Sequence, residues 1–168
     1  SAVNAHLYYG VHKTDKCTTF REWAPNATAL YLLCDLNSWK KDEKFSFEKK
    51  ENGNWELNLQ NDILKHGDLF KWLVVWNGGE GERIPAYATR VVQDNETKLF
   101  SAQIWDPVPY EWKHNSPKKI ENPLIYEAHI GMSTEEYGIA TYNSFRRDVL
   151  PEISKLGYNT IQMMAIQE

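Results

Sequence analysis

The hydrophobic periodicity of this chain changes at a polar, proline-containing segment, and that change limits what the chain can fold into. Before the segment, short alternating or continuous apolar runs such as Cys17–Trp23 and Leu69–Trp76 are separated by turn signals. Many short strands between turns are typical of a β-sandwich. After the segment, apolar residues follow strand, then helical, then strand spacing, which is typical of a βαβ unit with parallel strands. The sequence therefore predicts two kinds of structure in one chain.

The first region predicts a mainly β fold with an immunoglobulin-like sandwich over residues 1–108. Ala29–Leu36 is nearly all apolar, as a central strand covered on both faces would be. The Asn52-Gly53 pair favours a tight hairpin turn, and the glycines from Gly78 onward end the strand that closes at Trp76. The expected strands are Cys17–Trp23, Ala29–Leu36, Lys44–Lys50, Asn52–Leu59, Leu69–Trp76 and Leu99–Trp105.

Residues 109–123 read as an extended linker, because repeated prolines fix φ and remove backbone donors. Residues 124–168 then predict one βαβ piece, with strands at Leu124–His129 and Asn159–Ile166. The helix between them has Thr141 as N-cap and Gly157 as C′ residue. Pro151 should either kink this helix or start a second short one.

Composition excludes several classes of function. The net charge of −4 and pI of about 5.8 argue against a nucleic-acid partner, and no apolar run approaches membrane-spanning length. Cys17 and Cys34 lie in strand-like runs without a signal peptide, which favours two reduced, buried thiols and a cytoplasmic location. The five His have no metal-ligand spacing, so no metal or cofactor is expected. Ser1 is not an initiator Met and indicates a trimmed chain.

Acidic and basic side chains near the end of the first βαβ strand are the available catalytic candidates. Glu127 and His129 share one face of the Leu124–His129 strand, where an acid and a base could act together, but no second carboxylate accompanies them there. A structural role is therefore expected for both. Glu135, Glu136 and Tyr137 read as solvated loop residues.

Six blocks of the sequence together resemble a known family: Phe20–Thr28 (FREWAPNAT), Asp35–Trp39 (DLNSW), His66–Trp72 (HGDLFKW), Arg83–Ala88 (RIPAYA), Leu124–Ser133 (LIYEAHIGMS) and Gly157–Glu168 (GYNTIQMMAIQE). In this order they resemble the 1,4-alpha-glucan branching enzymes of the alpha-amylase superfamily. The first four resemble the carbohydrate-binding module family 48, or isoamylase N-terminal, domain. The last two resemble the start of a glycoside hydrolase family 13 barrel.

The resemblance implies an N-terminal fragment with one βαβ piece of a truncated TIM barrel, because such a barrel needs eight strands and roughly 250 residues. Family members carry their catalytic Asp, Glu and Asp on the fourth, fifth and seventh barrel strands. No residue here matches those strands, so the resemblance assigns no catalytic residue and implies that this chain alone is inactive. A stand-alone glycogen-binding module and a fragment of an isoamylase-type debranching enzyme are the alternatives.

The resemblance also implies glucan-binding positions at Trp39, Lys71 and Trp76. An indole offers a flat apolar surface to a sugar ring, and a lysine can donate to its hydroxyls. The alternative for Trp39 and Trp76 is core or interdomain packing, and Trp23, Trp55, Trp72 and Trp105 are expected in the core. The expected partners are an α-glucan and the remainder of the barrel. We also expect self-association through exposed barrel strands.

Overall fold

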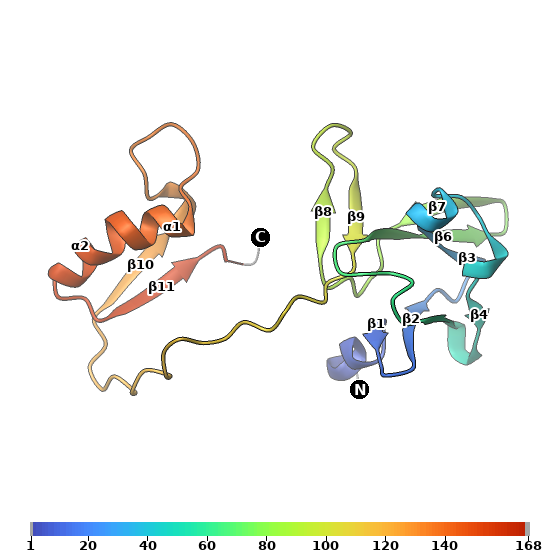
Figure 1. Cartoon of the computed structure of the whole chain (residues 1–168), viewed down its shortest axis with the longest axis horizontal. Helices are drawn as coiled ribbons and strands as arrows, with labels where there is room; N and C mark the ends of the chain where they lie inside the picture. The colour runs from blue at the N-terminus through green and yellow to red at the C-terminus, as the bar shows by residue number, and fades with distance from the viewer. Residues whose placement is uncertain (1, 167–168) are drawn as a thin grey trace. The chain divides into compact units, whose positions relative to one another are not determined.

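The computed structural model describes residues 2–166. Ser1, Gln167 and Glu168, where two predicted domain boundaries fall, lie outside the described residues. The chain divides into two compact units, Ser1–Tyr110 and Glu111–Glu168 (Figure 1), and each unit is described by itself.

The first unit contains two antiparallel sheets. One sheet has the order β1-β2-β5-β4, built from β1 (Gly10–Lys13), β2 (Cys17–Trp23), β5 (Asn54–Gln60) and β4 (Glu48–Lys49). The other has the order β3-β6-β9-β8, with β7 paired to β6, built from β3 (Ala27–Cys34), β6 (Leu69–Trp76), β9 (Phe100–Gln103), β8 (Val91–Gln93) and β7 (Gly79–Arg83). Short 3₁₀ helices lie at Ala2–Leu7, Asp35–Asn37, Glu43–Phe45 and Glu51–Gly53. The predicted β-rich first region is confirmed.

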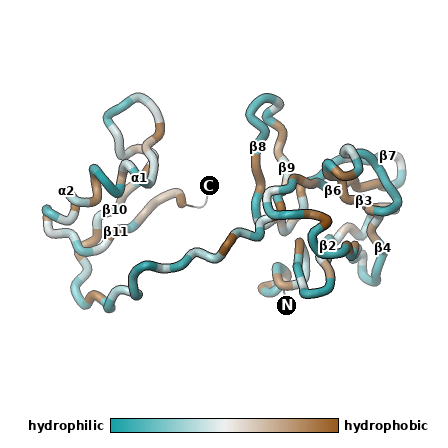
Figure 2. The backbone as a smooth tube through the Cα atoms, in the orientation of Figure 1, coloured by the Kyte–Doolittle hydropathy of each residue, from teal (hydrophilic) through white to brown (hydrophobic). Residues whose placement is uncertain are grey.

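A core of buried apolar side chains from both sheets holds the first unit together. Phe20 of β2 and Trp55 of β5 share one cluster with Phe70 and Trp72 of β6. The ring centroids of Phe20 and Trp72 lie 5.9 Å apart at 84°, an edge-to-face contact. Figure 2 shows the hydrophobic stretches of β3 and β6 that supply much of this cluster. The two sheets therefore form a sandwich.

One buried carboxylate, that of Glu22 on β2, links the two sheets. Its Oε2 accepts from the indole Nε1 of Trp72 at 3.0 Å and from the backbone N of Ala86 at 3.0 Å. Its Oε1 accepts from the backbone N of Trp23 at 2.9 Å. A buried carboxylate is tolerated where its oxygens are hydrogen-bonded, so Glu22 ties β2 to β6 and to the 84–88 segment.

Two strand predictions in the first unit are corrected by local chemistry. Lys44–Lys50 forms only the two-residue strand β4, because Asp42 accepts from the backbone N of Lys44 at 2.9 Å and starts a 3₁₀ helix instead. The glycines after Trp76 do not simply end the sheet, since Gly79–Arg83 turns back and pairs antiparallel with β6. The Asn52-Gly53 turn prediction is confirmed, with φ of 57° and 79° at the two residues.

Both cysteines are free thiols, and their environments differ. Cys34 is buried at the end of β3, and burial raises the pKa of its thiol. Cys17 is only half-buried, so the prediction of two buried thiols is half right. A thiol with a raised pKa is a poor nucleophile, which makes Cys34 a packing residue.

The second unit contains a two-stranded parallel sheet with helical segments between its strands. β10 (Ile125–His129) pairs with β11 (Thr160–Met164), with Ile125 opposite Thr160. Between them lie a 3₁₀ helix at Ile130–Met132, α1 (Tyr142–Ser144), a π-helical turn at Phe145–Val149 and α2 (Leu150–Lys155). Their small core consists of Ala128, Ile130, Phe145 and Ile153, with Tyr126, Val149 and Ile161 against it. The predicted strand, helix and parallel strand are confirmed.

The helical signals in the second unit act as predicted. Thr141 accepts a hydrogen bond from the backbone N of Ser144 at 3.1 Å and caps α1. Pro151 lies in the first turn of α2, directly after the π-helical turn. A wider turn relieves the clash between a proline ring and the carbonyl four residues earlier. Leu156, the C-cap residue of α2, is exposed. No helix within residues 2–166 is long and apolar enough to cross a membrane.

Candidate functional site

Strand alternation places a second apolar surface on the outer face of the β3-β6 sheet. On β6, Phe70 and Trp72 enter the sandwich core, whereas the alternate residues Lys71 and Leu73 point away from it. Leu33 of β3 is directly opposite Lys71. We call the outer apolar cluster the outer patch: Tyr31, Leu33 and Leu73, with Ala29, Trp39 and Val75 packed against them. β3 is thus covered on both faces, as its apolar run predicts.

The turn that follows β3 positions Trp39 on the outer patch. Ser38 and Trp39 both have left-handed backbone conformations, with φ of 53° and 57°. Each such residue costs roughly 1 kcal/mol or more unless the surrounding structure enforces it. Here the backbone N of Trp39 donates to Cys34 O at 2.9 Å, and its indole Nε1 donates to Asp35 Oδ1 at 2.6 Å.

Asn37 reinforces this turn. Its Nδ2 donates to Leu32 O at 2.8 Å, and its Oδ1 accepts from the backbone N of Cys34 at 3.0 Å. The side chain of Asn37 thereby replaces the sheet hydrogen bonds that the chain leaves when it turns. Trp39 is consequently held half-buried, with one part packed on the patch and another part open to solvent.

Lys71 brings a cation to the same face. Its side chain is only 12% exposed, and its Nζ lies 2.9 Å from Glu82 Oε2, whose side chain is 50% exposed. Glu82 is on β7 opposite Leu73, so the ion pair spans the two strands diagonally. An ammonium has three N–H donors, and the contact with Glu82 uses one of them. The pair therefore offers further donors and acceptors on the face of the sheet that Trp39 also occupies.

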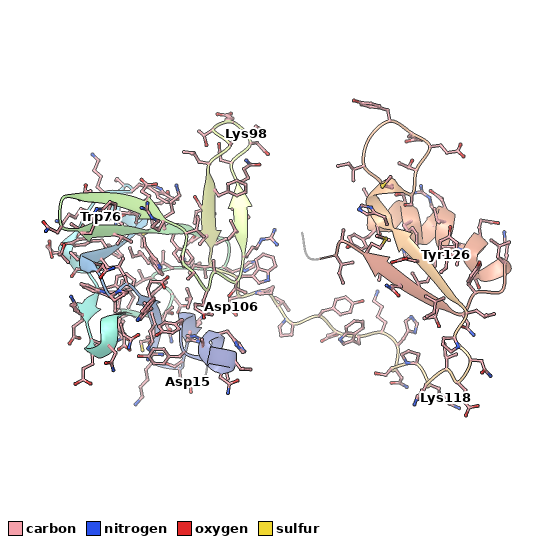
Figure 3. All side chains as sticks on the ribbon, turned by 180° about the vertical axis from the view of Figure 1, so that it is seen from behind. Asp15, Trp76, Lys98, Asp106, Lys118 and Tyr126 are labelled. Carbon is pink, nitrogen blue, oxygen red and sulfur yellow. The ribbon has the colours of Figure 1, made fainter. Side chains whose placement is uncertain are left out.

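The third predicted position, Trp76, lies elsewhere. Lys71 and Trp76 are five residues apart on one strand, so they point to opposite faces. The ring of Trp76 instead covers the β6-β7 hairpin: a Cβ added at Gly79 or Gly81 would lie 3.3 Å from it. The guanidinium of Arg83 lies 5.4 Å from its centroid (Figure 3 labels Trp76). The structure places Trp39 and Lys71 on the same face of the β3-β6 sheet and Trp76 on the opposite face.

Of the four tryptophans expected in the core, two are there. Trp55 and Trp72 are 3% and 1% exposed, which confirms the expectation for both. Trp23 and Trp105 are 56% and 42% exposed, so the expectation is wrong for them. Each of these two follows a residue that points into the core, Glu22 and Ile104 respectively, so alternation directs both indoles away from the core.

The catalytic candidates of the second unit are all exposed side chains. Glu127 and His129 are both exposed on β10, and Glu127 Oε1 accepts from Gln162 Nε2 at 3.4 Å. Glu135, Glu136 and Tyr137 are exposed in the loop after Met132. Within residues 2–166, no group of three or more His, Cys, Asp or Glu could hold a metal ion.

Sequence reasoning missed Glu82, the partner of Lys71. Gly78, Gly79 and Gly81 surround it and read as a strand terminator, although the alternation of Glu80 and Glu82 between glycines was a usable strand signal. It also missed Tyr31, which anchors the outer patch: its hydroxyl donates to Glu43 Oε1 at 3.2 Å, and Lys41 Nζ lies 4.8 Å from its ring centroid.

Comparison with known proteins gives one family match. Residues 8–88 match carbohydrate-binding module 48 (isoamylase N-terminal domain).

Curated relatives match over most of the chain. The 1,4-alpha-glucan-branching enzyme of Dictyostelium discoideum is 39% identical over 168 residues, which cover 96% of this chain and 25% of the relative. That of Rhizophagus irregularis is 43% identical over 89% of this chain and 23% of the relative. The 1,4-alpha-glucan-branching enzyme 2-2, chloroplastic/amyloplastic, of Arabidopsis thaliana is 40% identical over 95% of this chain and 21% of the relative. The chain spans about a quarter of the length of these relatives.

Solved structures share the fold. The pullulanase from Bacillus acidopullulyticus matches with a TM-score of 0.69 at 22% identity. The match covers 95% of this chain and 22% of the pullulanase chain. The Group B Streptococcus pullulanase SAP in complex with maltotetraose has a TM-score of 0.64 at 18% identity and covers 92% of this chain and 23% of its own. At such identities the likeness shows the fold alone.

Proposed function

Since residues 8–88 match carbohydrate-binding module 48 (isoamylase N-terminal domain), we propose that this chain is the N-terminal, glucan-binding part of a 1,4-alpha-glucan branching enzyme. The observation that carries the proposal is the 37–43% identity to proteins of that name over 89% or more of the chain. These relatives come from an amoeba, fungi and a plant. The likeness to pullulanases is at 18–22% identity, so it gives little weight to a debranching enzyme.

The parent protein would cut an α-1,4 glucan by double displacement and transfer the released chain to a 6-hydroxyl. That reaction needs a carboxylate nucleophile and a carboxyl acid/base about 5 Å apart. We assign neither to this chain. Its part in the reaction is to hold glucan near the barrel and to support the barrel.

The second unit fits the beginning of that barrel. A (β/α)₈ barrel is built of parallel strands joined by helical crossovers, and the parallel pairing of β10 and β11 around a helical segment supports this assignment. We accordingly propose residues 1–108 as the binding module, 109–123 as the linker and 124–168 as the first barrel piece. The remainder of the barrel would be the natural partner of β10 and β11.

The outer patch would bind glucan by stacking and hydrogen bonding. An exposed part of the Trp39 indole covering one glucose face removes roughly 100 Å² of apolar area, worth about 2–3 kcal/mol at the usual coefficient. Hydrogen bonds from Lys71 add about 1–2 kcal/mol, and ordering of the oligosaccharide consumes part of this. A dissociation constant on the order of millimolar results, which is useful on a polymer with many repeats.

Trp76 is proposed to contact only long glucan chains. Because it lies across the β6-β7 hairpin and not on the outer patch, it could contact only a glucan long enough to pass around the sheet edge. Short oligosaccharides should therefore depend on Trp39 and Lys71 and be indifferent to Trp76.

Substitutions on the outer patch test the proposal directly. Trp39→Ala should abolish retention of the chain on a glycogen affinity gel, and Lys71→Met, which keeps the alkyl stem, should weaken it. Trp23→Ala removes a more exposed indole from the other sheet and should retain normal binding. Equal retention of the Trp39→Ala and Trp23→Ala chains would contradict the proposal, and a lowered melting temperature without a change in binding would make Trp39 a packing residue.

We also propose a cytoplasmic location, which the two free thiols of Cys17 and Cys34 support. Fractionation of the source cells, with the chain detected by antibody, tests this. Recovery in an oxidising compartment, or in a plastid as in the name of the Arabidopsis relative, would contradict it.

A further inference from the structure

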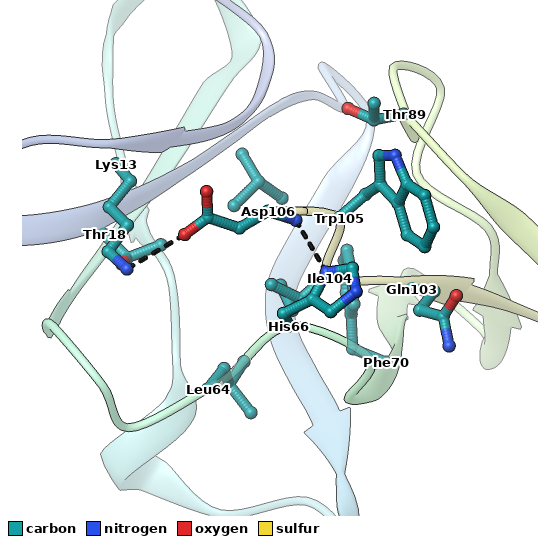
Figure 4. A pocket seen from close by; sticks show the side chains of 11 residues that line it. Lys13, Thr18, Leu64, His66, Phe70, Thr89, Gln103, Ile104, Trp105 and Asp106 are labelled. Carbon is teal, nitrogen blue, oxygen red and sulfur yellow. Dashed lines mark hydrogen bonds and ion pairs between the residues drawn. The ribbon is translucent and has the colours of Figure 1, made fainter. Parts of the chain in front are cut away.

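A cavity within the first unit lies apart from the outer patch. It has a volume of about 180 Å³ and is lined from β1, from the turn before β6 and from the segment after β9. Its buried lining residues are mostly apolar, among them Leu64, Phe70 and Ile104. Polar side chains surround the opening, and Figure 4 shows the His66 ring beside the backbone N of Asp106, whose carboxylate points toward Lys13.

His66 accepts one hydrogen bond, which fixes the tautomer of its neutral ring. The backbone N–H of Asp106 donates to His66 Nδ1 at 3.0 Å, so the neutral ring must carry its proton on Nε2. No other group of residues 2–166 is hydrogen-bonded to this ring, although the Trp105 ring lies 4.7 Å from it between centroids. The Nε2–H is therefore available to a ligand.

Asp106 supplies an acceptor at the same opening. Its Oδ2 accepts from Lys13 Nζ at 3.1 Å, and within residues 2–166 no donor contacts Oδ1. Lys13 also lies 3.8 Å from Asp62, so its single positive charge is shared between two carboxylates. A carboxylate oxygen paired on one side retains lone pairs for a hydroxyl.

The charges around the cavity select a neutral ligand. Among the lining residues, Lys13 and Asp106 form an ion pair, with Nζ and Oδ2 3.1 Å apart. The Arg90 guanidinium, outside the lining, lies 4.1 Å from the centroid of the Trp105 ring. An anion would meet the Asp106 carboxylate, and a cation would meet the Lys13 ammonium. A ligand that carries both donors and acceptors without net charge, such as a sugar, satisfies His66 and Asp106 together.

We propose that this cavity is a second carbohydrate site that accepts a single sugar ring. At about 30 Å³ per water, its volume corresponds to about six waters, and it is smaller than the roughly 300 Å³ at which sites for larger ligands begin. One sugar hydroxyl donates to Asp106 Oδ1 and another accepts from His66 Nε2–H, while the exposed part of Trp105 borders the ring. The choice of an α-glucan among sugars rests on the proposed function, whereas the preference for a neutral hydroxyl-rich ligand does not.

The seven tryptophan indole N–H signals of the ¹⁵N-labelled chain allow both sites to be observed at once. Maltotriose should shift the signals of Trp39 and Trp105, assigned through Trp→Phe variants, and inorganic phosphate should shift neither. Asp106→Asn and His66→Asn should each weaken the apparent affinity reported by Trp105 by about ten-fold, through loss of one charge-assisted or oriented hydrogen bond. The affinity reported by Trp39 should stay the same. The Asn at 66 retains an acceptor for the Asp106 amide and loses only the Nε2–H.

Asp62→Asn is the matched control, because it removes a carboxylate from the same lysine but Asp62 does not line the cavity. It should leave the Trp105 response within about two-fold, as expected for an exposed pair. A Trp105 signal that ignores maltotriose while the Trp39 signal responds would overturn this inference and leave the proposed function intact. The reverse pattern would overturn the outer-patch proposal and leave the cavity as a sugar site. A response to phosphate, or equal losses in Asp62→Asn and Asp106→Asn, would also overturn the inference.

Discussion

The two units of this chain bury the apolar faces of their sheets in different ways. In the first unit, two antiparallel sheets cover each other, and large rings such as Phe20 and Trp72 become almost fully buried. In the second, β10 and β11 have helical segments on one face, and the cluster there is small, built around Phe145 and Ile153. Two-stranded sheets are marginal in water, whereas sandwiches are self-sufficient. Stability within this chain should therefore be concentrated in the first unit.

The comparison predicts its largest effect at Trp72. Trp72→Ala should cost about 4–5 kcal/mol, because it creates a cavity and also deprives the buried Glu22 carboxylate of its indole donor. Chemical denaturation followed by far-ultraviolet circular dichroism measures this. Trp23→Ala, at an exposed indole, should cost less than about 1 kcal/mol, and similar losses in the two variants would refute the described core.

A smaller and more local effect is expected in the second unit. Phe145→Ala should cost about 3 kcal/mol. We expect this loss to exceed the free energy of unfolding of the second unit. Hydrogen exchange should show loss of amide protection in β10 and β11, with β2 and β6 unchanged. Leu156→Ala, at a side chain 73% exposed, is the matched control and should leave protection in place. Loss of protection in β2 upon Phe145→Ala would show that the two units unfold together.

Self-association is expected to arise from the second unit and not from the first. Within the described residues β10 and β11 pair only with each other, so each leaves an unpaired edge that can recruit another strand. The weight-average mass in sedimentation should rise with concentration, and Met164→Lys should reduce that rise by about two-fold or more in apparent affinity. Met132→Lys, at a methionine outside the strands, should not. A chain that stays monomeric at every concentration would contradict the expected edge pairing.

The smallest expected effect is on the pH dependence of the stability of the first unit. Arg21 Nε lies 2.7 Å from Glu56 Oε2, and this contact, with a second from Asn58, holds the pKa of Glu56 below its usual value of 4.5. A lowered folded pKa means that Glu56 contributes stability above pH 4.5 and loses it as the pH falls through the folded pKa. Glu56→Gln should remove roughly 0.5–1 kcal/mol at pH 7 and flatten the decline between pH 5 and 3. An unchanged slope in thermal unfolding across that range would contradict the assignment.

Much of this protein follows from local sequence pattern. The alternation in CTTFREW gives β2 with its observed bounds, the caps at Thr141 and Gly157 enclose the helical region, and Pro151 lies in the first turn of α2. Lys71 and Trp76 are five positions apart, and this odd separation would also have shown that their side chains point to opposite faces of β6. Periodicity, capping and turn chemistry act over a few residues, and such signals can be read without a fold.

Only the tertiary structure decided which side chains are covered and which are left open. Trp55 and Trp72 are core residues while Trp23 and Trp105 are exposed, although all four look alike in sequence. Their burial depends on which face of each segment meets the opposing sheet, and Glu22 and Ile104 take the inward positions next to Trp23 and Trp105. The pairing of Lys71 with Glu82 and the approach of His66 to Asp106 likewise join residues 11 and 40 positions apart. Such contacts depend on strand register and on where the chain leaves the sheet, and a local pattern carries no information on either.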